Sequence, residues 1–270
     1  MGVTGAEIGV IGGSGFYSLL DGMTDVAVTT PYGDPSDAVA VGEIGGRAVA
    51  FLPRHGGGHR LPAHEVNYRA NMWALRSLGV RQVIAPVAVG SLRPELGPGA
   101  VVVPDQLVDR TSGRAQTYYD SGAAHVQFAD PYCPAGRAAV LKAGAEAGQA
   151  PVDGATMVVV QGPRFSTRAE SRWFAGQGWS LVNMTGHPEA VLARELAICY
   201  TALALVTDYD AGVDAASAVS QAEVFEVFAR NIESLRDLVC RVVPTLPVPS
   251  ARSCPCPAAL DGMTLPFDLP

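Results

Sequence analysis

Short apolar runs alternate with amphipathic stretches along most of this chain, and this pattern limits its fold more than any other feature. Seven runs are short and apolar enough to form buried strands: residues 8–11, 49–52, 83–87, 101–103, 157–160, 181–182 and 202–206. The stretches between them carry apolar residues at helical spacing: residues 66–78, 134–147, 168–174, 187–197 and 221–243. The alternation favours an α/β fold with a mixed, largely parallel sheet flanked by helices.

One domain accounts for most of the chain. No repeat, low-complexity tract or linker divides residues 1–245, and 48% of the 270 residues are hydrophobic, enough for an ample core. Residues 246–270 are rich in proline and cannot form a continuous helix, because each proline removes a backbone donor and clashes with the preceding turn. We expect this tail to pack on the domain or on a neighbouring subunit.

The charge excludes two classes of partner. A net charge of −7 gives no broad positive surface, so we expect neither nucleic acid nor a membrane surface as a partner, and any anion must be bound locally. No apolar run is long enough to span a bilayer. The first residues show no basic leader or cleavage site, which predicts a cytoplasmic protein.

The cysteines argue against a thiol-based scaffold. Except for Cys254 and Cys256, the five cysteines are far apart in the sequence, so we predict neither a disulfide framework nor a four-ligand zinc site. We expect most of them to be reduced thiols. A strained disulfide between Cys254 and Cys256 is the alternative.

Three glycine-containing turns follow predicted strands and are compatible with an anion. The first carries Ser14, the second carries Arg54 and His55, and the third covers residues 88–91. Small residues let backbone amides approach an anion, and a guanidinium matches phosphate geometry. Because ligands gather beyond the carboxyl ends of strands in open α/β sheets, we expect the three turns to share one phosphate.

A metal is the competing interpretation of the second turn. His55 and His59 are four residues apart, but the glycines between them cannot hold the rings as a helix does. We therefore predict no metal there.

The segments at residues 161–170 and 182–189 also follow apolar runs. Helix capping by Thr167 or Ser166 with Glu170 explains part of the first segment. It does not explain Phe165, an aromatic residue at a strand end beside several anion-compatible turns.

These motifs resemble the trimeric purine nucleoside phosphorylase family, in its methylthioadenosine phosphorylase branch. The resemblance covers about residues 7–245 and is carried, in this order, by GGSGFY, RHGGGH, HEVNYRANMWAL, VGSL, VDRT with TYYD, DPYCP, GPRFSTRAES, VNMTGHPE and TDYD. It implies a nucleoside phosphorylase catalytic domain at residues 1–245, a homotrimer with sites near subunit interfaces, and no metal or organic cofactor. A purine nucleoside and inorganic phosphate are the implied substrates.

The resemblance also implies roles for individual residues. Phosphate would be held by Ser14, Arg54, His55, the backbone at Val87 and Ala88, and the Thr185 hydroxyl. The nucleoside would be contacted by Phe165 stacking on the purine, Ser166 at the base edge, Met184 at the ribose, and His125 reaching a neighbouring subunit's pocket.

Two positions depart from the family pattern. Val87 stands where Thr or Asn is frequent, so phosphate contact at this turn would involve only the backbone. Gln221 stands where methylthioadenosine enzymes tend to place an apolar residue near the 5′ substituent. Gln221 either faces solvent or bonds a 5′-hydroxyl. The end of the tail, residues 265–270, could close over the same substituent.

Asp208 and Asp210 flank Tyr209 after the last apolar run and, taken alone, would indicate only a polar loop. In the family context, Asp208 would donate a proton to purine N7, which requires a pKa raised by burial and by the nearby Asp210. Asp210 would accept from the exocyclic amine. A 6-oxopurine would leave these groups unpaired, so the pair predicts a 6-aminopurine.

The predicted function is phosphorolysis of 5′-methylthioadenosine to adenine and 5-methylthioribose 1-phosphate. The alternative within the class is a purine nucleoside phosphorylase acting on adenosine, inosine or another 5′-modified nucleoside. A nucleotide-binding regulatory module and a hydrolase using water are alternatives outside it. The intact phosphate residues and both acids argue against the first, and a phosphate cage would have no purpose in the second.

Overall fold

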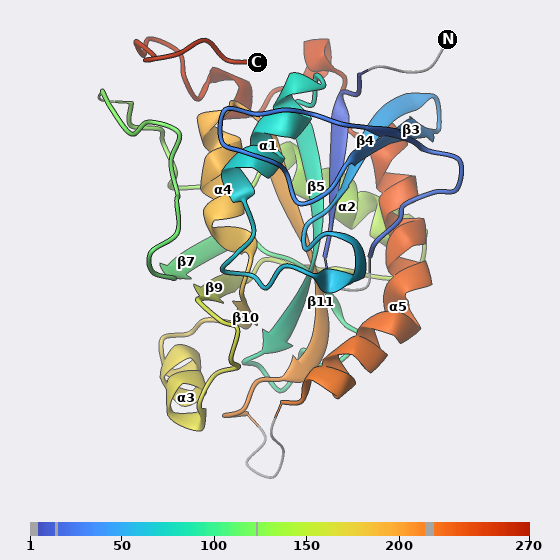
Figure 1. The fold of residues 1–270 in the computed structure, drawn as a ribbon. Helices are drawn as coiled ribbons and strands as arrows, with labels where there is room; N and C mark the ends of the chain where they lie inside the picture. The colour runs from blue at the N-terminus through green and yellow to red at the C-terminus, as the bar shows by residue number, and fades with distance from the viewer. Residues whose placement is uncertain (1–4, 14–15, 123, 214–218) are drawn as a thin grey trace.

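A single curved sheet with helices on both faces forms the body of the protein (Figure 1). The computed structural model describes residues 5–13, 16–122, 124–213 and 219–270. The strands are β1 (Ile8–Gly12), β2 (Thr24–Val26), β3 (Val39–Ile44), β4 (Arg47–Pro53), β5 (Gln82–Ser91), β6 (Val101–Val103), β7 (Gln106–Arg110), β8 (Val152–Asp153), β9 (Thr156–Val160), β10 (Leu181–Asn183) and β11 (Cys199–Tyr209). The helices are α1 (Tyr68–Ser77), α2 (Pro134–Glu146), α3 (Arg168–Gly176), α4 (Gly186–Glu195) and α5 (Gln221–Val242).

Strand β5 is the centre of the sheet. The main path runs β2-β3-β4-β1-β5-β10-β9-β7, and β11 pairs along almost the whole length of β5. β5 is parallel to β1 and β11 and antiparallel to β10. The sheet is therefore mixed, as the sequence predicts, and it branches at β5 so that β10 and β11 both border its carboxyl end.

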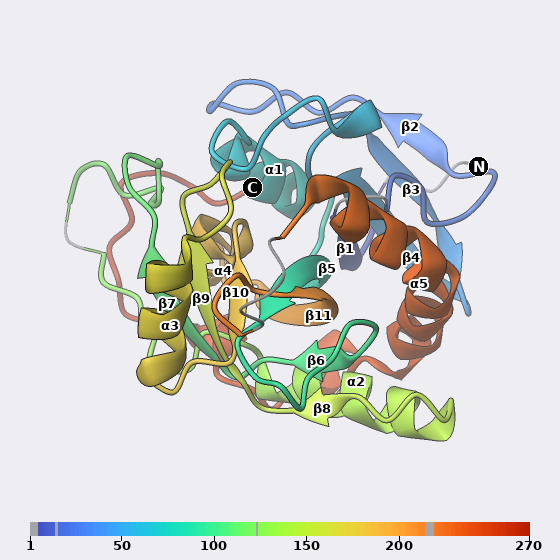
Figure 2. The same cartoon turned by 90° about the horizontal axis from the view of Figure 1, so that it is seen from below.

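Two hydrophobic cores cover the two faces of the sheet. One includes Leu75 of α1 and Leu192 of α4, and the other includes Val140 of α2 and Leu235 of α5. Figure 2, which views the molecule from below, shows α2 and α5 on one side of β5 and β11 and α1 and α4 on the other. Burial of these stripes fixes the helices against the sheet.

Side chains define where several helices begin. Asn67 accepts a hydrogen bond from the Ala70 amide at the start of α1, and Ser220 accepts one from Glu223 at the start of α5. Thr167 and Glu170 form a reciprocal capping box at α3, which confirms the capping interpretation of that segment.

The predicted strands and helices are all present, with ends displaced by a few residues. The strands that sequence did not predict are β2, β3, β7 and β8. β2 and β8 are two or three residues long and largely exposed, so neither presents an apolar run. In the described part of the chain, no helix combines the length and hydrophobicity needed to cross a bilayer.

The C-terminal tail packs on the domain through short turns and an aromatic contact. The Phe267 ring lies 5.6 Å from Trp73 of α1 and 5.4 Å from Tyr119, measured between ring centroids. In Figure 1 the tail ends at the top of the molecule, whereas the carboxyl ends of β5 and β11 point downward.

Four cysteines that are separated along the chain lie close together in the structure. The sulfur atoms of Cys133, Cys199, Cys254 and Cys256 all lie within 4.8 Å of one another. Separation along the chain does not report this proximity, because the fold brings the start of α2, the start of β11 and the tail to one place.

Candidate active site

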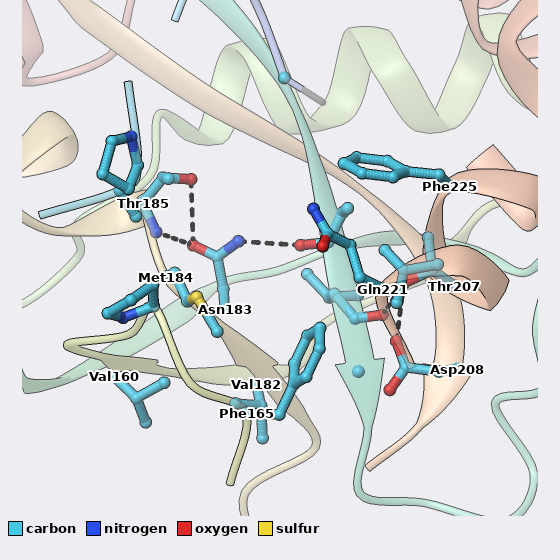
Figure 3. A pocket seen from close by; sticks show the side chains of 18 of the residues that line it. Val160, Phe165, Val182, Asn183, Met184, Thr185, Thr207, Asp208, Gln221 and Phe225 are labelled. Carbon is cyan, nitrogen blue, oxygen red and sulfur yellow. Dashed lines mark hydrogen bonds between the residues drawn. The ribbon is translucent and has the colours of Figure 1, made fainter. Parts of the chain in front are cut away.

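A cavity of about 360 Å³ lies at the carboxyl ends of β5, β10 and β11 (Figure 3). Its volume is suited to a small molecule such as a nucleoside. The lining groups into three walls: an acidic wall on β11, a wall of anion-compatible groups from β4, β5 and the start of α4, and a more apolar wall on α5.

A bulge in β11 forms the acidic wall. Val206 pairs with Val89 and Asp208 pairs with Gly90, so Thr207 is an extra residue in the ladder. Both Thr207 and Asp208 line the cavity as a result. The Thr207 hydroxyl donates to Asp208 Oδ2 at 2.8 Å (Figure 3).

Gly90 allows the two acids to approach β5. A Cβ atom at this position would lie 3.0 Å from Asp208 Oδ1 and 3.4 Å from Asp210 Cβ. A side chain there would push against both aspartates. The glycine of the third predicted turn therefore makes room for the acids.

Burial raises the pKa of both acids. The pKa of Asp208 is raised to about 6, mainly by burial and also by the nearby Asp210 charge. The hydrogen bond from Thr207 acts in the opposite direction and lowers the pKa. Burial also raises the pKa of Asp210, while the nearby Ser171 and Ser166 hydroxyls lower it. The structure thus supports the raised pKa that the sequence predicts for Asp208, with burial as the larger cause.

Phe165 and Ser166 face the acidic wall from the segment before α3. Both line the cavity, and Figure 3 shows the Phe165 ring between Val182 and Asp208. Ser166 Oγ and Asp210 Oδ2 are buried without a hydrogen-bond partner within normal distance among the described residues. Both atoms are therefore available to a polar ligand.

Arg54 sits behind the anion-compatible wall and is 1% exposed. Its Nε and Nη2 donate to the two carboxylate oxygens of Glu189 at 2.7 and 2.8 Å. Nη2 lies 3.4 Å from the Ile11 carbonyl and Nη1 donates to the Pro86 carbonyl at 3.1 Å. Among the described groups, only one N–H of Nη1 is left for a ligand. Most of the guanidinium N–H groups that the sequence assigns to phosphate are therefore already bonded, two of them to Glu189.

Glu189 also stabilises the positive charge of the Arg54 guanidinium. Burial by itself would lower the pKa of Arg54, but the attraction and hydrogen bonds of Glu189 raise it above its usual value. Tyr200 donates to Glu189 Oε2 at 2.7 Å. The pair is therefore a fully bonded buried ion pair.

His55 is neutral in this environment. Burial first, and then the charges of Arg54 and His59, lower its pKa to about 3. His55 Nδ1 lies 2.8 Å from the Leu61 carbonyl, which can only accept, so Nδ1 carries the proton. Nε2 is then free to accept a hydrogen bond.

Asn183 organises the start of α4. Its Oδ1 accepts from the Thr185 amide at 2.8 Å, and its Nδ2 donates to the Ala88 carbonyl at 3.0 Å (Figure 3). Oδ1 also accepts from the Gly186 amide at 2.6 Å. These bonds hold Thr185, the N-cap residue of α4, against β5. Met184, Thr185 and Ala88 all line the cavity, as predicted.

The third wall combines apolar and polar side chains. Val224 and Phe225 of α5 line the cavity with Pro62. Gln221, at the first turn of α5, and His59 also line it, and His59 packs edge-on against Phe225 at 5.7 Å.

Two predicted site residues, Val87 and His125, do not line this cavity. A third, Ser14, lies outside the described residues. Val87 does not line the cavity, because its side chain points into the buried core on the other face of β5 from Ala88. His125 is exposed and lies outside the cavity of its own subunit, so its role at a neighbouring site stays a prediction.

Residues 265–270 do not close over the cavity in this structure. Phe267 packs on Trp73 and Tyr119, neither of which lines it. The reason is that the tail runs to the opposite end of the sheet.

Sequence reasoning missed several site residues. Asn183 and Thr207 are adjacent to predicted site residues, and Phe225 lies one helical turn after Gln221. Those spacings could have indicated them. Glu189 could not be found as the partner of Arg54, because the two are 135 residues apart.

Comparison with known proteins identifies the family of the chain. The sequence profile described as the phosphorylase superfamily matches residues 7–244. The chain is 60% identical to a purine nucleoside phosphorylase of Streptomyces coelicolor and 60% identical to an S-methyl-5′-thioadenosine phosphorylase of Mycobacterium tuberculosis, each over 98% of both chains. A solved methylthioadenosine phosphorylase of Schistosoma mansoni in complex with adenine superposes with a TM-score of 0.86 at 37% identity, covering 89% of this chain and 91% of the other. With a profile match over most of its length and relatives of this identity, the chain belongs to the phosphorylase superfamily.

Proposed function

We propose that this chain catalyses the phosphorolysis of 5′-methylthioadenosine to adenine and 5-methylthioribose 1-phosphate. The observation that carries the proposal is the pair of half-buried Asp208 and buried Asp210 at one wall of a cavity whose opposite wall presents Arg54 and Thr185. The similarity to S-methyl-5′-thioadenosine phosphorylases supports it.

Asp208 is suited to protonate the leaving base. A carboxyl group with a pKa of about 6 is partly protonated near neutral pH and can donate to N7 as the glycosidic bond breaks. Asp210 Oδ2 can accept from the exocyclic amine of adenine, and Ser166 Oγ can bond the same edge of the base. The Phe165 ring would stack on the purine.

Phosphate itself is the nucleophile, so the proposed reaction requires no nucleophilic side chain and no organic cofactor. The remaining Arg54 N–H would donate to phosphate, at the positive end of α4. The Thr185 hydroxyl would also donate to phosphate, in exchange for its long 3.4 Å bond to Asn183 Oδ1. His55 Nε2 would accept from a protonated phosphate oxygen. The wall would act by positioning phosphate below the sugar, with Met184 against the ribose.

We also propose that the working form is a homotrimer in the cytoplasm. The segment that contains His125 extends away from the body of the subunit at the left of Figure 1, where it can meet a neighbour. His125 is exposed, as a residue that reaches another subunit's cavity would be. None of the five cysteines, all of which lie in the described part of the chain, is in a disulfide, which suits a reducing compartment. Light scattering on the eluting protein measures the subunit number directly.

A second candidate is a phosphorylase for adenosine, inosine or another 5′-modified nucleoside. Gln221 lines the cavity, and His59 Nδ1 is buried without a partner among the described residues, so either can bond a 5′-hydroxyl. The apolar side chains of Val224, Phe225 and Pro62 favour a methylthio group at the same wall. The ratio of kcat/KM for methylthioadenosine to that for adenosine decides between them.

The variant Asp208→Asn tests the role of the acidic wall. We expect adenine release from methylthioadenosine to fall by about 10²–10⁴-fold, because the amide cannot supply a proton to N7. Phosphate binding, measured by calorimetry, should be unchanged, because the opposite wall is intact.

Asp237→Asn, which removes an exposed carboxylate on α5, is the matched control and should keep full turnover. If Asp208→Asn released adenine at the normal rate, the assignment of the base side would be wrong.

A further inference from the structure

Four cysteine sulfur atoms gather at the end of β11 that is farthest from the cavity. Cys133 directly precedes α2, Cys199 is the first residue of β11, and Cys254 and Cys256 are in the tail. Their Sγ atoms all lie within 4.8 Å of one another, and those of Cys199 and Cys254 are 3.4 Å apart. The proposed reaction does not use any of them.

The backbone holds two of these residues in place independently of their thiols. The Cys133 amide donates to the Tyr200 carbonyl at 2.8 Å, and the Cys199 amide donates to the Arg81 carbonyl at 3.0 Å. Cys256 begins a short 3-10 helix, Cys256–Ala258. The domain thus supplies a fixed pair of sulfur atoms and the tail supplies a second pair.

The surroundings are those of a closed thiolate site. Cys133, Cys199 and Cys256 are each at most 3% exposed, and Cys254 is half-buried at the outer side.

The geometry is closer to one shared centre than to two disulfides. A disulfide requires two sulfur atoms about 2 Å apart and leaves the two pairs independent of each other. A tetrahedral ion with metal–sulfur distances of about 2.3 Å requires all four sulfur atoms to be about 3.8 Å apart. The observed set needs to contract by only about 1 Å at its widest separation to reach that arrangement.

We propose that Cys133, Cys199, Cys254 and Cys256 bind one Zn²⁺ ion in a structural site that fastens the C-terminal tail to the domain. Four soft sulfur ligands and no open position suit zinc. Binding one Zn²⁺ converts four thiols to thiolates and releases four protons, with no change of oxidation state.

The site has no part in phosphorolysis. Cys199 and Asp208 are nine residues apart on one extended strand, roughly 30 Å. The ion is therefore expected to stabilise the tail without contacting the substrate.

Cobalt titration of the full-length protein tests the site. The protein is stripped with a chelator under reducing conditions and titrated with Co²⁺, which shows intense visible and near-ultraviolet absorption when four thiolates bind it tetrahedrally. We expect about one Co²⁺ per chain, displaced by Zn²⁺, and the same amount of zinc by mass spectrometry in protein grown with zinc.

Cys254→Ser removes the half-buried ligand, and Cys240→Ser removes the thiol on α5 that lies outside the cluster. We expect the first to lose the absorption while keeping the wild-type circular dichroism, and the second to retain it. Chelator should lower Tm in wild type and in Cys240→Ser but not in Cys254→Ser.

Absence of thiolate absorption in the reduced wild-type protein would overturn the proposal. So would an equal loss of absorption in both variants, or protein mass showing two disulfides with no zinc in material prepared without reductant.

Discussion

Asp208 shows how a residue placed for chemistry can reduce the stability of the fold. Its half-buried carboxyl group lies against Thr207 and Gly90, and its pKa is raised to about 6, mainly by burial. The sequence predicts the raised pKa from burial and from Asp210. It does not predict the bulge at Thr207 or the need for a glycine at position 90, because both arise from pairing of β11 with β5.

The raised pKa predicts a pH-dependent cost that Asp208→Asn removes. The pKa of Asp208 is higher in the folded state than in the unfolded state. Between about pH 4 and 6 the folded state therefore holds a proton that the unfolded state has lost, so the unfolding free energy falls as pH rises through that window. We expect the unfolding free energy of Asp208→Asn, relative to that of wild type, to be about 2–3 kcal/mol higher at pH 8 than at about pH 4.5.

Urea unfolding of both proteins at the two pH values measures this difference. Asp237→Asn, which removes an exposed carboxylate, should show almost no pH-dependent gain. A gain for Asp208→Asn of the same size at both pH values would mean that Asp208 is ionised normally in the folded protein.

Helix α4 joins two parts of the site. Its N-cap residue Thr185 faces the cavity, and Glu189, one turn later, holds Arg54. The periodicity of residues 187–197 predicts the helix but not this role, because a helical pattern does not show which distant strand the inward face meets.

Loss of the Glu189 charge should therefore affect both the stability of the fold around α4 and the binding of phosphate. In Glu189→Gln the buried guanidinium keeps its charge without a carboxylate partner, so we expect the unfolding free energy to fall by about 3–5 kcal/mol. KM for phosphate should rise, because Arg54 loses its fixed position.

The exposed pair of Asp237 and Arg241 provides the contrast. Asp237→Asn should change stability little, since exposed ion pairs contribute little. Equal effects of the two variants in chemical denaturation would contradict a structural role for the buried pair.

At the scale of the whole molecule, the sheet separates the site from the tail. The cavity lies at the carboxyl ends of the central strands, and Phe267 packs near the opposite end of the sheet. We expect Phe267→Ala to lower the unfolding free energy by about 1–2 kcal/mol through lost ring contacts.

The same variant should leave KM for methylthioadenosine unchanged. Asp268→Ala, at the exposed neighbouring position, is its control. A large rise in KM for Phe267→Ala alone would show that the tail reaches a cavity, in this subunit or the next.

How far the sequence predicts this molecule depends on the kind of pattern involved. Apolar patterns predict the helices and the strands that form continuous apolar runs, because each of these buries a face of its own. They do not predict β3, whose buried residues alternate with less buried ones. They also do not predict β2 and β8, which are short and exposed, or the meeting of Cys133, Cys199 and the tail. Those contacts depend on the assembled sheet.

The measurement that tests the central claim most directly is adenine release from methylthioadenosine with and without inorganic phosphate. We predict release only with phosphate, together with an equal amount of 5-methylthioribose 1-phosphate. Release at the same rate without phosphate, or no release from any 6-aminopurine nucleoside, would contradict the account.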